Sequence, residues 1–372
     1  MAEATVIILG ASTRAAAVSA RRAGWTPWCA DLFADADLQR IATVRKVPID
    51  AYPHGLLEAL ADAPQAPVLY TGALENRPDL IAKINRPLWG NPPDTLRTVR
   101  SPEQWTRCLL ERGFPCPALS AEPTDVGRWL LKPRKSAGGF GIHAYGRQPF
   151  EVRSHFLQEW IDGQPCSAVY LGMGGQVCLL GVTLQLIGTP WLNATGFHYA
   201  GSIGPLPLDS MAQRAWRQLG AALEKAFGLR GLFGVDAILR DGVPWPVEIN
   251  PRYTASIEIL ERSFGVALLT CHRAIFEGRH SPAFNPPTTP VIHGKAILYA
   301  RRRLTFPDRG PWVDSLQGAA LDSSEYADIP DAGEVIEQGR PVLTLFASAC
   351  TVTECMASLQ EKAQALDRRL WG

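Results

Sequence analysis

Two carboxylates and an amide within residues 231–256 have a spacing that would suit a metal site. Asp236 lies in an aliphatic, strand-like run, and Glu248 and Asn250 alternate with apolar residues in the next run. Period-two alternation places Glu248 and Asn250 on one face of a strand. If residues 241–243 form a three-residue turn, Asp236 lies directly opposite Glu248. Oxygens of these types are the ligands that Mg²⁺ or Mn²⁺ prefers.

An isolated pattern of this kind more often marks the polar face of an exposed hairpin, so the rest of the chain decides between the two interpretations. A second candidate is Lys132, which ends a predicted strand and begins the glycine-rich segment KPRKSAGGFGI. Such a loop can fold over a polyphosphate and bind it with backbone N–H groups. The pattern GxxxxGK[ST] of the common phosphate-binding loop is absent.

The first turn of the chain is a candidate substrate contact. An apolar run ends at Gly10, and Ser12, Thr13 and Arg14 then lead into an alanine-rich helix. The N–H groups at a helix N-terminus, with nearby hydroxyls, can hold an anion. The GxGxxG spacing is absent, which argues against a dinucleotide cofactor. A purely structural turn is an equally good interpretation.

Glu75 and His198 are further candidates for substrate contacts because of the loops that they occupy. Glu75 follows a buried strand predicted at 68–71, and open α/β sheets bind ligands at the carboxyl ends of their strands. His198 lies in a long glycine-rich segment, residues 193–207, of the kind that often forms an active-site lid. The alternative interpretation, that His198 is a surface histidine without a functional role, describes the more common case.

The order of the predicted elements divides the chain into three parts. Residues 1–95 alternate short apolar strands with helices, as in a doubly wound parallel α/β domain. Residues 96–285 predict antiparallel sheets and a helix at 210–227, with a lid subdomain at about 128–170. Residues 291–372 predict a small β-rich module with a closing helix. The expected fold class is α/β, and α+β overall.

Charge and composition exclude several classes of protein. The 37 Lys and Arg against 36 Asp and Glu give a net charge of +1, which disfavours nucleic acid as a partner. No run approaches the roughly 20 apolar residues that span a bilayer, and no basic region precedes the first apolar run. The eight scattered cysteines form no CxxC or Cys/His cluster, which is typical of a reducing compartment. We therefore expect a cytoplasmic protein without a membrane partner.

Three motifs together resemble those of the ATP-grasp superfamily and occur in that family's order. They are the lysine with its glycine-rich loop, a hinge strand QEWI at 158–161, and the metal hairpin that ends in EINPR at 248–252. The resemblance extends from residue 1 to about 350. The segments HGKAILYA and DIPDAGEVIEQGRPVLT are most similar to the branch of biotin carboxylase and the related ATP-dependent carboxylate–amine ligases, or carboligases.

The resemblance implies an ATP-grasp fold and a role for each motif. Lys132 would contact the phosphates of ATP, and the hinge strand would contact adenine. Asp236, Glu248 and Asn250 would hold one or two Mg²⁺ or Mn²⁺ ions. Arg252 would stabilise the transferred phosphoryl group, so that Arg252 and Lys132 are the implied catalytic residues. The implied ATP contacts are Lys132, Ser136, Gly138, Gly139, Gly141, Gln158, Glu159 and Ile161.

Two positions depart from the family pattern. Pro165 stands where family members commonly carry an acidic residue that binds ribose. Gln104 and Trp105 occupy the region where a basic residue is usual. Arg100 and Arg107 are the alternatives for that basic residue.

The implied function is the ATP-dependent ligation of a carboxylate to an amine through an acyl-phosphate, with release of ADP and phosphate. This reaction needs no protein nucleophile, and the sequence contains no convincing Cys/His or Ser/His/Asp arrangement. Both substrates, the carboxylate and the amine, would be small molecules. The protein could form a homodimer. Two alternatives remain open: a carboxylase that forms carboxyphosphate from bicarbonate, and a nucleotide-binding regulatory protein whose catalysis has lapsed.

Overall fold

The N-terminal sheet has four parallel strands in the order β3-β2-β1-β4. The computed structural model describes residues 4–121, 128–317 and 324–372. The central strand β1 is almost completely buried because it is covered on both faces, as parallel strands usually are. The elements of this part are β1 (Thr5–Gly10), α1 (Arg14–Arg22), β2 (Thr26–Asp31), α2 (Ala36–Gln39), β3 (Thr43–Lys46), α3 (Gly55–Glu58), η1 (Ala59–Asp62), β4 (Val68–Tyr70), η2 (Leu74–Asn76), α4 (Pro78–Ile81) and α5 (Pro93–Val99).

A small antiparallel sheet follows, in the order β5-β8-β6-β7. The glycine-rich loop connects its strands β6 and β7. The elements are α6 (Pro102–Leu110), β5 (Leu119–Ser120), β6 (Trp129–Pro133), β7 (His143–Ala144) and β8 (His155–Glu159).

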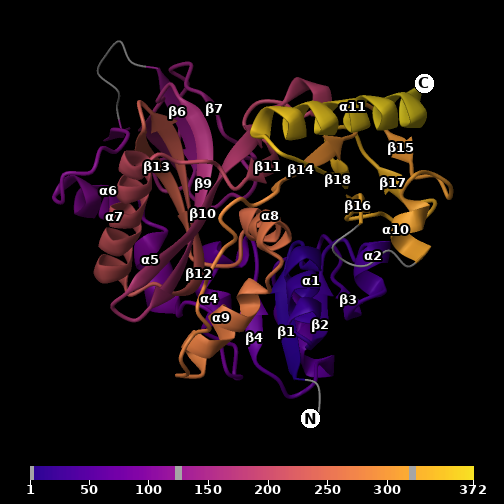
Figure 1. Ribbon diagram of the computed structural model, residues 1–372, viewed down its shortest axis with the longest axis horizontal. Helices are drawn as coiled ribbons and strands as arrows, with labels where there is room; N and C mark the ends of the chain where they lie inside the picture. The colour runs from indigo at the N-terminus through magenta and orange to yellow at the C-terminus, as the bar shows by residue number, and fades with distance from the viewer. Residues whose placement is uncertain (1–3, 122–127, 318–323) are drawn as a thin grey trace.

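The largest sheet is antiparallel and has the order β13-β12-β9-β10-β11-β14-β18-β16. Figure 1 shows α7 beside the strands of its first half and α11 lying over β14 and β18. Its strands are β9 (Gln164–Met173), β10 (Val177–Ile187), β11 (Tyr199–Gly204), β12 (Arg230–Arg240), β13 (Val243–Asn250), β14 (Ile292–Tyr299), β16 (Tyr326–Ala327) and β18 (Pro341–Ala349). The other elements are η3 (Pro190–Leu192), α7 (Ser210–Phe227), α8 (Ala255–Phe264), α9 (Leu268–Phe276), β15 (Leu304–Thr305), α10 (Val313–Gln317), β17 (Val335–Ile336) and α11 (Val352–Trp371).

This combination of a parallel sheet with antiparallel sheets confirms the expected fold class. The C-terminal strands β14, β18 and β16 extend the large sheet and cover what would be its open edge at β11. The prediction of a loop through residues 193–207 is wrong for residues 199–204, which form β11. No helix in the described part of the chain is long and apolar enough to span a membrane.

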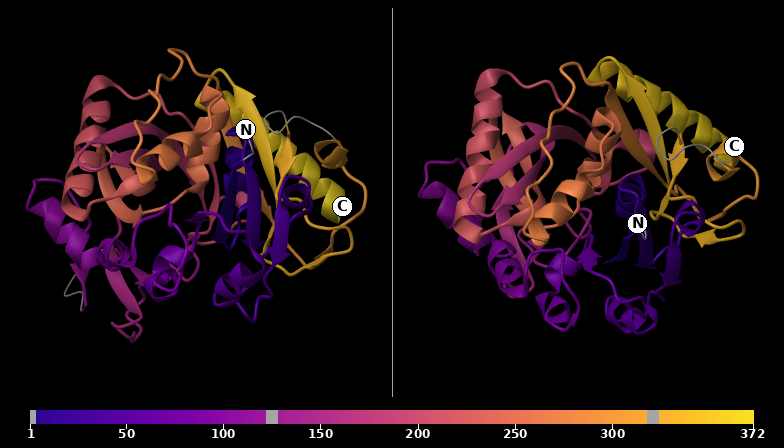
Figure 2. Two further views of the ribbon diagram at one scale, coloured as in Figure 1. Left: turned by 90° about the horizontal axis from the view of Figure 1, so that it is seen from below. Right: turned by 60° about the horizontal axis from the view of Figure 1, so that its bottom comes forward.

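The C-terminal segment returns to the N-terminal sheet. The N–H group of Ala36 donates to the carbonyl of Ile329 at 2.8 Å. The carboxylate of Asp37 accepts the N–H groups of Asp328 and Ile329 at 3.0 and 2.9 Å. In Figure 2 the yellow end of the chain lies beside the indigo N-terminal sheet. Both ends of the chain can therefore contribute to one site.

We expect the buried His272 on α9 to weaken the fold at acid pH. Its Nδ1 accepts the N–H of Leu232 at 2.8 Å, and its Nε2 lies 3.0 Å from the carbonyl of Trp89, so the ring is neutral. Burial lowers the pKa of His272 to about 4. Between the ordinary value of 6.5 and 4 the unfolded chain binds the proton more readily, so the stabilisation present above pH 6.5 is lost as the pH falls.

The measurement compares wild type with His272→Gln by urea unfolding at pH 7 and pH 5. The difference in free energy of unfolding between the two proteins should shrink by about 2 kcal/mol at pH 5. The comparison with the variant is needed because other buried groups titrate in the same range. An unchanged difference would show that His272 is not held neutral.

Candidate active site

A cavity of about 730 Å³ opens where the parallel sheet, the small antiparallel sheet and the large sheet meet. Its walls are the carboxyl ends of β1 and β4, the glycine-rich loop, the end of β8, and the hairpin of β12 and β13. Most of the site residues predicted from the sequence line it. They are Ser12, Arg14, Glu75, Lys132, Ser136, Gly138, Gly139, Gln158, Glu159, Ile161, Asp236, Glu248, Asn250 and Arg252.

The hairpin places Asp236 opposite Glu248, as the sequence predicts, but not through a three-residue turn. Arg240 pairs with Val243, so the turn has only two residues, 241 and 242, both with positive φ. A two-residue turn alone would shift the register by one position. A β-bulge after Asp236 takes up the extra residue and restores the pairing of the two carboxylates.

The bulge also creates the acceptor for the lysine of the first motif. Val247 is the residue without a partner in the ladder, and its carbonyl accepts a hydrogen bond from Lys132 Nζ at 3.2 Å. A second bond runs from the same nitrogen to Gln158 Oε1 at 3.0 Å. Burial lowers the pKa of Lys132, although the charges of Glu248 and Asp236 oppose the shift. The lysine is thus held at the wall of the cavity between the small and the large sheet.

The two carboxylates differ in their electrostatic surroundings. Burial and the charge of Glu248 raise the pKa of Asp236 to about 6. Burial also opposes ionisation of Glu248, but Arg100 and Lys132 outweigh it, and the pKa of Glu248 lies below its ordinary value. Asp236 accepts hydrogen bonds from Gln185 at 3.0 Å and from Asn250 at 2.9 Å.

These residues fit a Mg²⁺ ion that shares its coordination with a ligand. A divalent cation would relieve the repulsion that raises the pKa of Asp236. The described residues contain no group of three His, Cys, Asp or Glu side chains that could hold a metal. A metal bound by Asp236, Glu248 and Asn250 would therefore take its remaining oxygens from water or phosphate, as Mg²⁺ commonly does.

Arg100, rather than Arg107, reaches this site. Its guanidinium lies 2.6 Å from a carboxylate oxygen of Glu248 and donates to Asn76 Oδ1 at 3.0 Å. Arg107 is exposed on α6 and does not line the cavity. Asn76 in turn donates to the carbonyl of Ser136 at 3.0 Å. Arg100 and Asn76 thus connect the carboxylates to the glycine-rich loop.

The glycine-rich loop packs against the start of β11. The N–H of Tyr199 donates to the carbonyl of Gly138 at 2.9 Å. At Gly139, where φ is +78°, an added Cβ would lie 1.8 Å from the carbonyl oxygen of Phe197. The ring of Phe140 packs on His198 with 4.2 Å between centroids. Only glycine can make this close approach at position 139.

Four of the predicted site residues do not line the cavity. An added Cβ at Gly10 would lie 1.9 Å from the hydroxyl of Thr71, so this glycine permits close packing. The N–H and hydroxyl of Thr13 both donate to Asp31, at 2.6 and 2.7 Å, which gives it a structural part in the turn. The other two are Gly141, which is exposed, and His198, which packs between aromatic rings.

Arg252 lies just beyond the carboxylates and is fixed by three acceptors. Its Nε donates to Glu75 Oε1 at 2.8 Å, and its Nη2 donates to Asn250 Oδ1 at 3.3 Å. Its Nη1 donates to the carbonyl of Tyr253 at 3.1 Å. The guanidinium is therefore oriented before any ligand binds.

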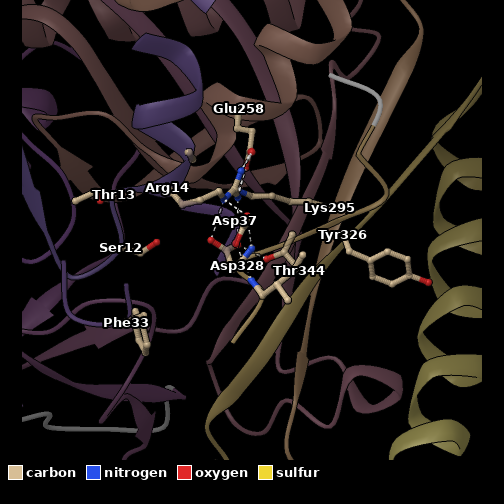
Figure 3. Close-up of polar contacts among 12 residues, drawn as sticks. Ser12, Thr13, Arg14, Phe33, Asp37, Glu258, Lys295, Tyr326, Asp328 and Thr344 are labelled. Atoms are coloured by element: carbon tan, nitrogen blue, oxygen red, sulfur yellow. Dashed lines mark hydrogen bonds and ion pairs between the residues drawn. The ribbon is translucent and has the colours of Figure 1, made fainter. Parts of the chain in front are cut away.

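The opposite end of the cavity contains a cluster of charges around Arg14. Figure 3 shows Arg14 between Glu258 and Asp328, with Lys295 approaching from β14. Arg14 forms two bonds with each carboxylate, and Lys295 Nζ lies 3.0 Å from Glu258. Despite burial, Arg14 holds the pKa of both carboxyl groups below the ordinary value. Lys295 was not among the site residues predicted from the sequence, although a lysine inside an apolar strand could have indicated a functional residue.

The comparisons with known proteins agree with this geometry. Residues 104–256 match the model of the ATP-grasp domain family. An uncharacterized protein of Methanocaldococcus jannaschii is 22% identical over 400 residues, which cover 98% of this chain and 93% of that protein. The carbamoyl phosphate synthase large chain of Thermomicrobium roseum is 23% identical over 300 residues, which cover 71% of this chain but only 27% of that protein.

Solved structures show the same fold over the whole chain. The L-amino acid ligase from Bacillus licheniformis superposes with a TM-score of 0.69 at 16% identity, over 96% of each chain. The matched domain contains the glycine-rich loop, the hinge strand and the metal hairpin, in the order that the sequence predicts. Residues 104–256 therefore form a domain of the ATP-grasp family, and the chain as a whole has the fold of the solved ligase.

Proposed function

We propose that the protein is an ATP-dependent ligase that joins a carboxylate to an amine. One observation carries the proposal: in a single cavity, three cationic side chains surround two carboxylates that face each other. Phosphoryl transfer depends on positioning and on neutralising charge, and it needs no protein nucleophile. The residues are Lys132, Arg100 and Arg252 around Asp236 and Glu248.

In this proposal the nucleotide occupies the wall formed by residues 96–285. Lys132 and the glycine-rich loop bind its phosphates, and backbone groups of residues 158–161 hold adenine. Mg²⁺ would neutralise charge on the phosphates when bound by the hairpin residues. The parts at 1–95 and 291–372, which we propose as the first and last domains, form the wall that binds the other substrates.

The reaction that we propose has two steps. A carboxylate oxygen attacks the γ-phosphorus of ATP, and ADP leaves with the electron pair of the broken P–O bond. The amine nitrogen then attacks the carbonyl carbon of the acyl-phosphate. A C–N bond forms, the C–O bond to phosphate breaks, phosphate leaves and the nitrogen loses a proton. Arg252 donates to the phosphoryl oxygens in both steps, where negative charge develops.

The test is a screen for ADP release from Mg-ATP with paired acids and amines. Hydroxylamine is added in a parallel series, because it traps an acyl-phosphate as a hydroxamate without the natural amine. Acid-dependent hydroxamate formation is the expected result. ADP release that needs bicarbonate but no amine would favour a carboxylase instead. Binding of ATP with no phosphate release across the panel would favour a regulatory protein.

Replacement of Gly139 by Ala should raise the KM for ATP about tenfold. The added Cβ would clash with the carbonyl of Phe197, so the loop could no longer seat on β11. Gly174 gives a matched control, since its φ is +73° and an added Cβ there would meet nothing within 4 Å. Gly174→Ala carries the same backbone cost in the turn between β9 and β10 and should leave the KM unchanged. Equal KM values for the two variants would contradict the role of the loop.

A further inference from the structure

One short turn beside the N-terminal sheet binds two of the three cationic side chains that surround the carboxylates. The turn is η2, which follows β4, and its residues Glu75 and Asn76 are 1% and 8% exposed. Glu75 accepts the Nε–H of Arg252 at 2.8 Å. Asn76 accepts the Nε–H of Arg100 at 3.0 Å. Two successive residues therefore bind two arginines from separate segments, one after β13 and one after α5.

The carboxylate of Glu75 is bonded to Arg252 alone within the described part of the chain. Its Oε1 accepts the bond from Arg252, and its Oε2 is buried without a hydrogen-bond partner there. Burial of a carboxylate is costly, and a single buried ion pair seldom returns more free energy of folding than that cost. The pair therefore contributes little net stability. Its clear effect is to fix the direction in which the guanidinium of Arg252 points.

Asn76 connects the same turn to the glycine-rich loop. Its Nδ2 donates to the carbonyl of Ser136 at 3.0 Å, while its Oδ1 accepts the bond from Arg100. Arg100 in turn donates to a carboxylate oxygen of Glu248 at 2.6 Å. The turn therefore contacts the loop and Arg100 through one side chain, and Arg252 through the other.

The backbone that leads into this turn has a strained conformation. Ala73 has a φ of +78°, in the left-handed region that a residue with a Cβ rarely adopts. The hydroxyl of Thr71 donates to the carbonyl of Ser12 at 2.9 Å, which fixes the loop to the start of α1. A Cβ added at Gly72 would lie 3.6 Å from Cζ of Arg252, so the loop packs against the guanidinium. Strain of this kind persists only where the surrounding contacts determine the conformation, and it is common at functional sites.

We propose that Glu75 is a positioning residue for phosphoryl transfer and that it acts through Arg252. It points the guanidinium toward the transferred phosphoryl group, and it makes that direction depend on the N-terminal sheet. This inference rests on the proposed ligase function, because it gives Glu75 a part in the same reaction. The sequence indicates a substrate contact for Glu75, and the two roles differ in their kinetics. Loss of a substrate contact raises the KM of that substrate, whereas loss of a positioning residue lowers kcat.

The first test is the kinetics of Glu75→Gln in the full-length protein. The substitution keeps the size of the side chain and an acceptor for Arg252, but it removes the charge that strengthens the bond. We expect kcat for ADP release to fall about tenfold or more. The KM of the acid and of the amine, and the affinity for a non-hydrolysable ATP analogue with Mg²⁺, should change less than about twofold. A raised KM with an unchanged kcat overturns the proposal.

Glu261→Gln is the matched control for this variant. Glu261 is a fully buried carboxylate that is paired with Arg22 at 3.0 Å, between α8 and α1, and it does not line the cavity. Its replacement removes the same charge from a second contact between the N-terminal sheet and the rest of the chain. The control should leave kcat within about twofold, even where the protein is less stable. Equal losses of kcat in the two variants would show a general effect of buried charge and overturn the proposal.

A double-mutant cycle separates action through Arg252 from direct contact with a substrate. In Arg252→Lys the group that Glu75 orients is absent, so the further change Glu75→Gln should lower kcat by no more than about twofold. Hydroxamate formation in a single turnover compares the wild type, the two single variants and the double variant. Losses that multiply in the double variant overturn the proposal, because Glu75 would then contribute independently of Arg252.

Asn76→Ala distinguishes positioning by Glu75 from general damage to the turn. It removes the bonds to Ser136 and Arg100 but leaves the bond between Glu75 and Arg252. The KM for ATP should therefore rise about fivefold, while kcat falls less than in Glu75→Gln. If the two variants change KM and kcat to the same extent, η2 is only a structural support and the proposal is overturned.

A measurement without turnover separates this inference from the ligase proposal. The Nε–H resonance of Arg252 in nitrogen-resolved NMR spectra is assigned by its loss in Arg252→Lys. It should shift or disappear in Glu75→Gln and stay unchanged in Glu261→Gln. If it does so while no acid and amine yield ADP or hydroxamate, the ligase proposal fails and the orientation of Arg252 by Glu75 stands. If hydroxamate forms and Glu75→Gln keeps the kcat of the wild type, the ligase proposal stands and the positioning role fails.

Discussion

Replacement of Glu248 by Gln is expected to abolish turnover while leaving the fold intact. The substitution keeps the size of the side chain and a hydrogen-bond acceptor for Arg100, whose guanidinium lies 2.6 Å from the carboxylate. It removes the charge that faces Asp236 across the hairpin and that would hold Mg²⁺. Metal stabilisation of this kind is worth several kcal/mol, so kcat should fall about a thousandfold or more.

ADP release under the conditions of the screen measures this effect, and the thermal midpoint checks the fold. The matched control is Glu361→Gln on the exposed side of α11. It removes the same charge far from the cavity and should leave kcat within about twofold. Retained activity in Glu248→Gln would show that the hairpin does not bind the catalytic metal.

The hairpin shows what the sequence could predict and what it could not. Alternation along β13 correctly placed Glu248 and Asn250 on one face. The turn length could not be derived, because a two-residue turn with a bulge and a three-residue turn give the same pairing of Asp236 with Glu248. The difference matters for the chemistry, since the bulge frees the carbonyl of Val247 that Lys132 uses.

Most of the structural features that the sequence could not predict depend on contacts between residues that are far apart in the chain. Arg14 was predicted as a substrate contact from its helix start, but its guanidinium is bound by Glu258 and Asp328, which lie 244 and 314 residues away. The strand β11 has few apolar residues and contains two glycines. It is a strand because β10 and β14 pair with it on both sides. Local patterns carry no information about such partners.

Replacement of Arg252 by Lys should lower kcat about a hundredfold to a thousandfold while changing the affinity for an ATP analogue little. The arginine is fixed by three bonds, to Glu75, Asn250 and the carbonyl of Tyr253. A lysine keeps the charge but cannot make these bonds with a planar fork, so the positive charge is no longer held where the transferred phosphoryl group is proposed to lie. Stabilisation that operates only in the transition state lowers kcat when it is lost and leaves ground-state binding unchanged.

Calorimetry with Mg²⁺ and the ATP analogue measures binding, and hydroxamate formation measures the first chemical step. Arg97→Lys on the exposed face of α5 is the matched control, because its guanidinium contacts only Asp94 in the described part of the chain. Loss of nucleotide affinity in Arg252→Lys, in proportion to the loss of kcat, would assign this arginine to ATP binding. Normal hydroxamate formation with slow amide formation would instead place its contribution in the attack of the amine.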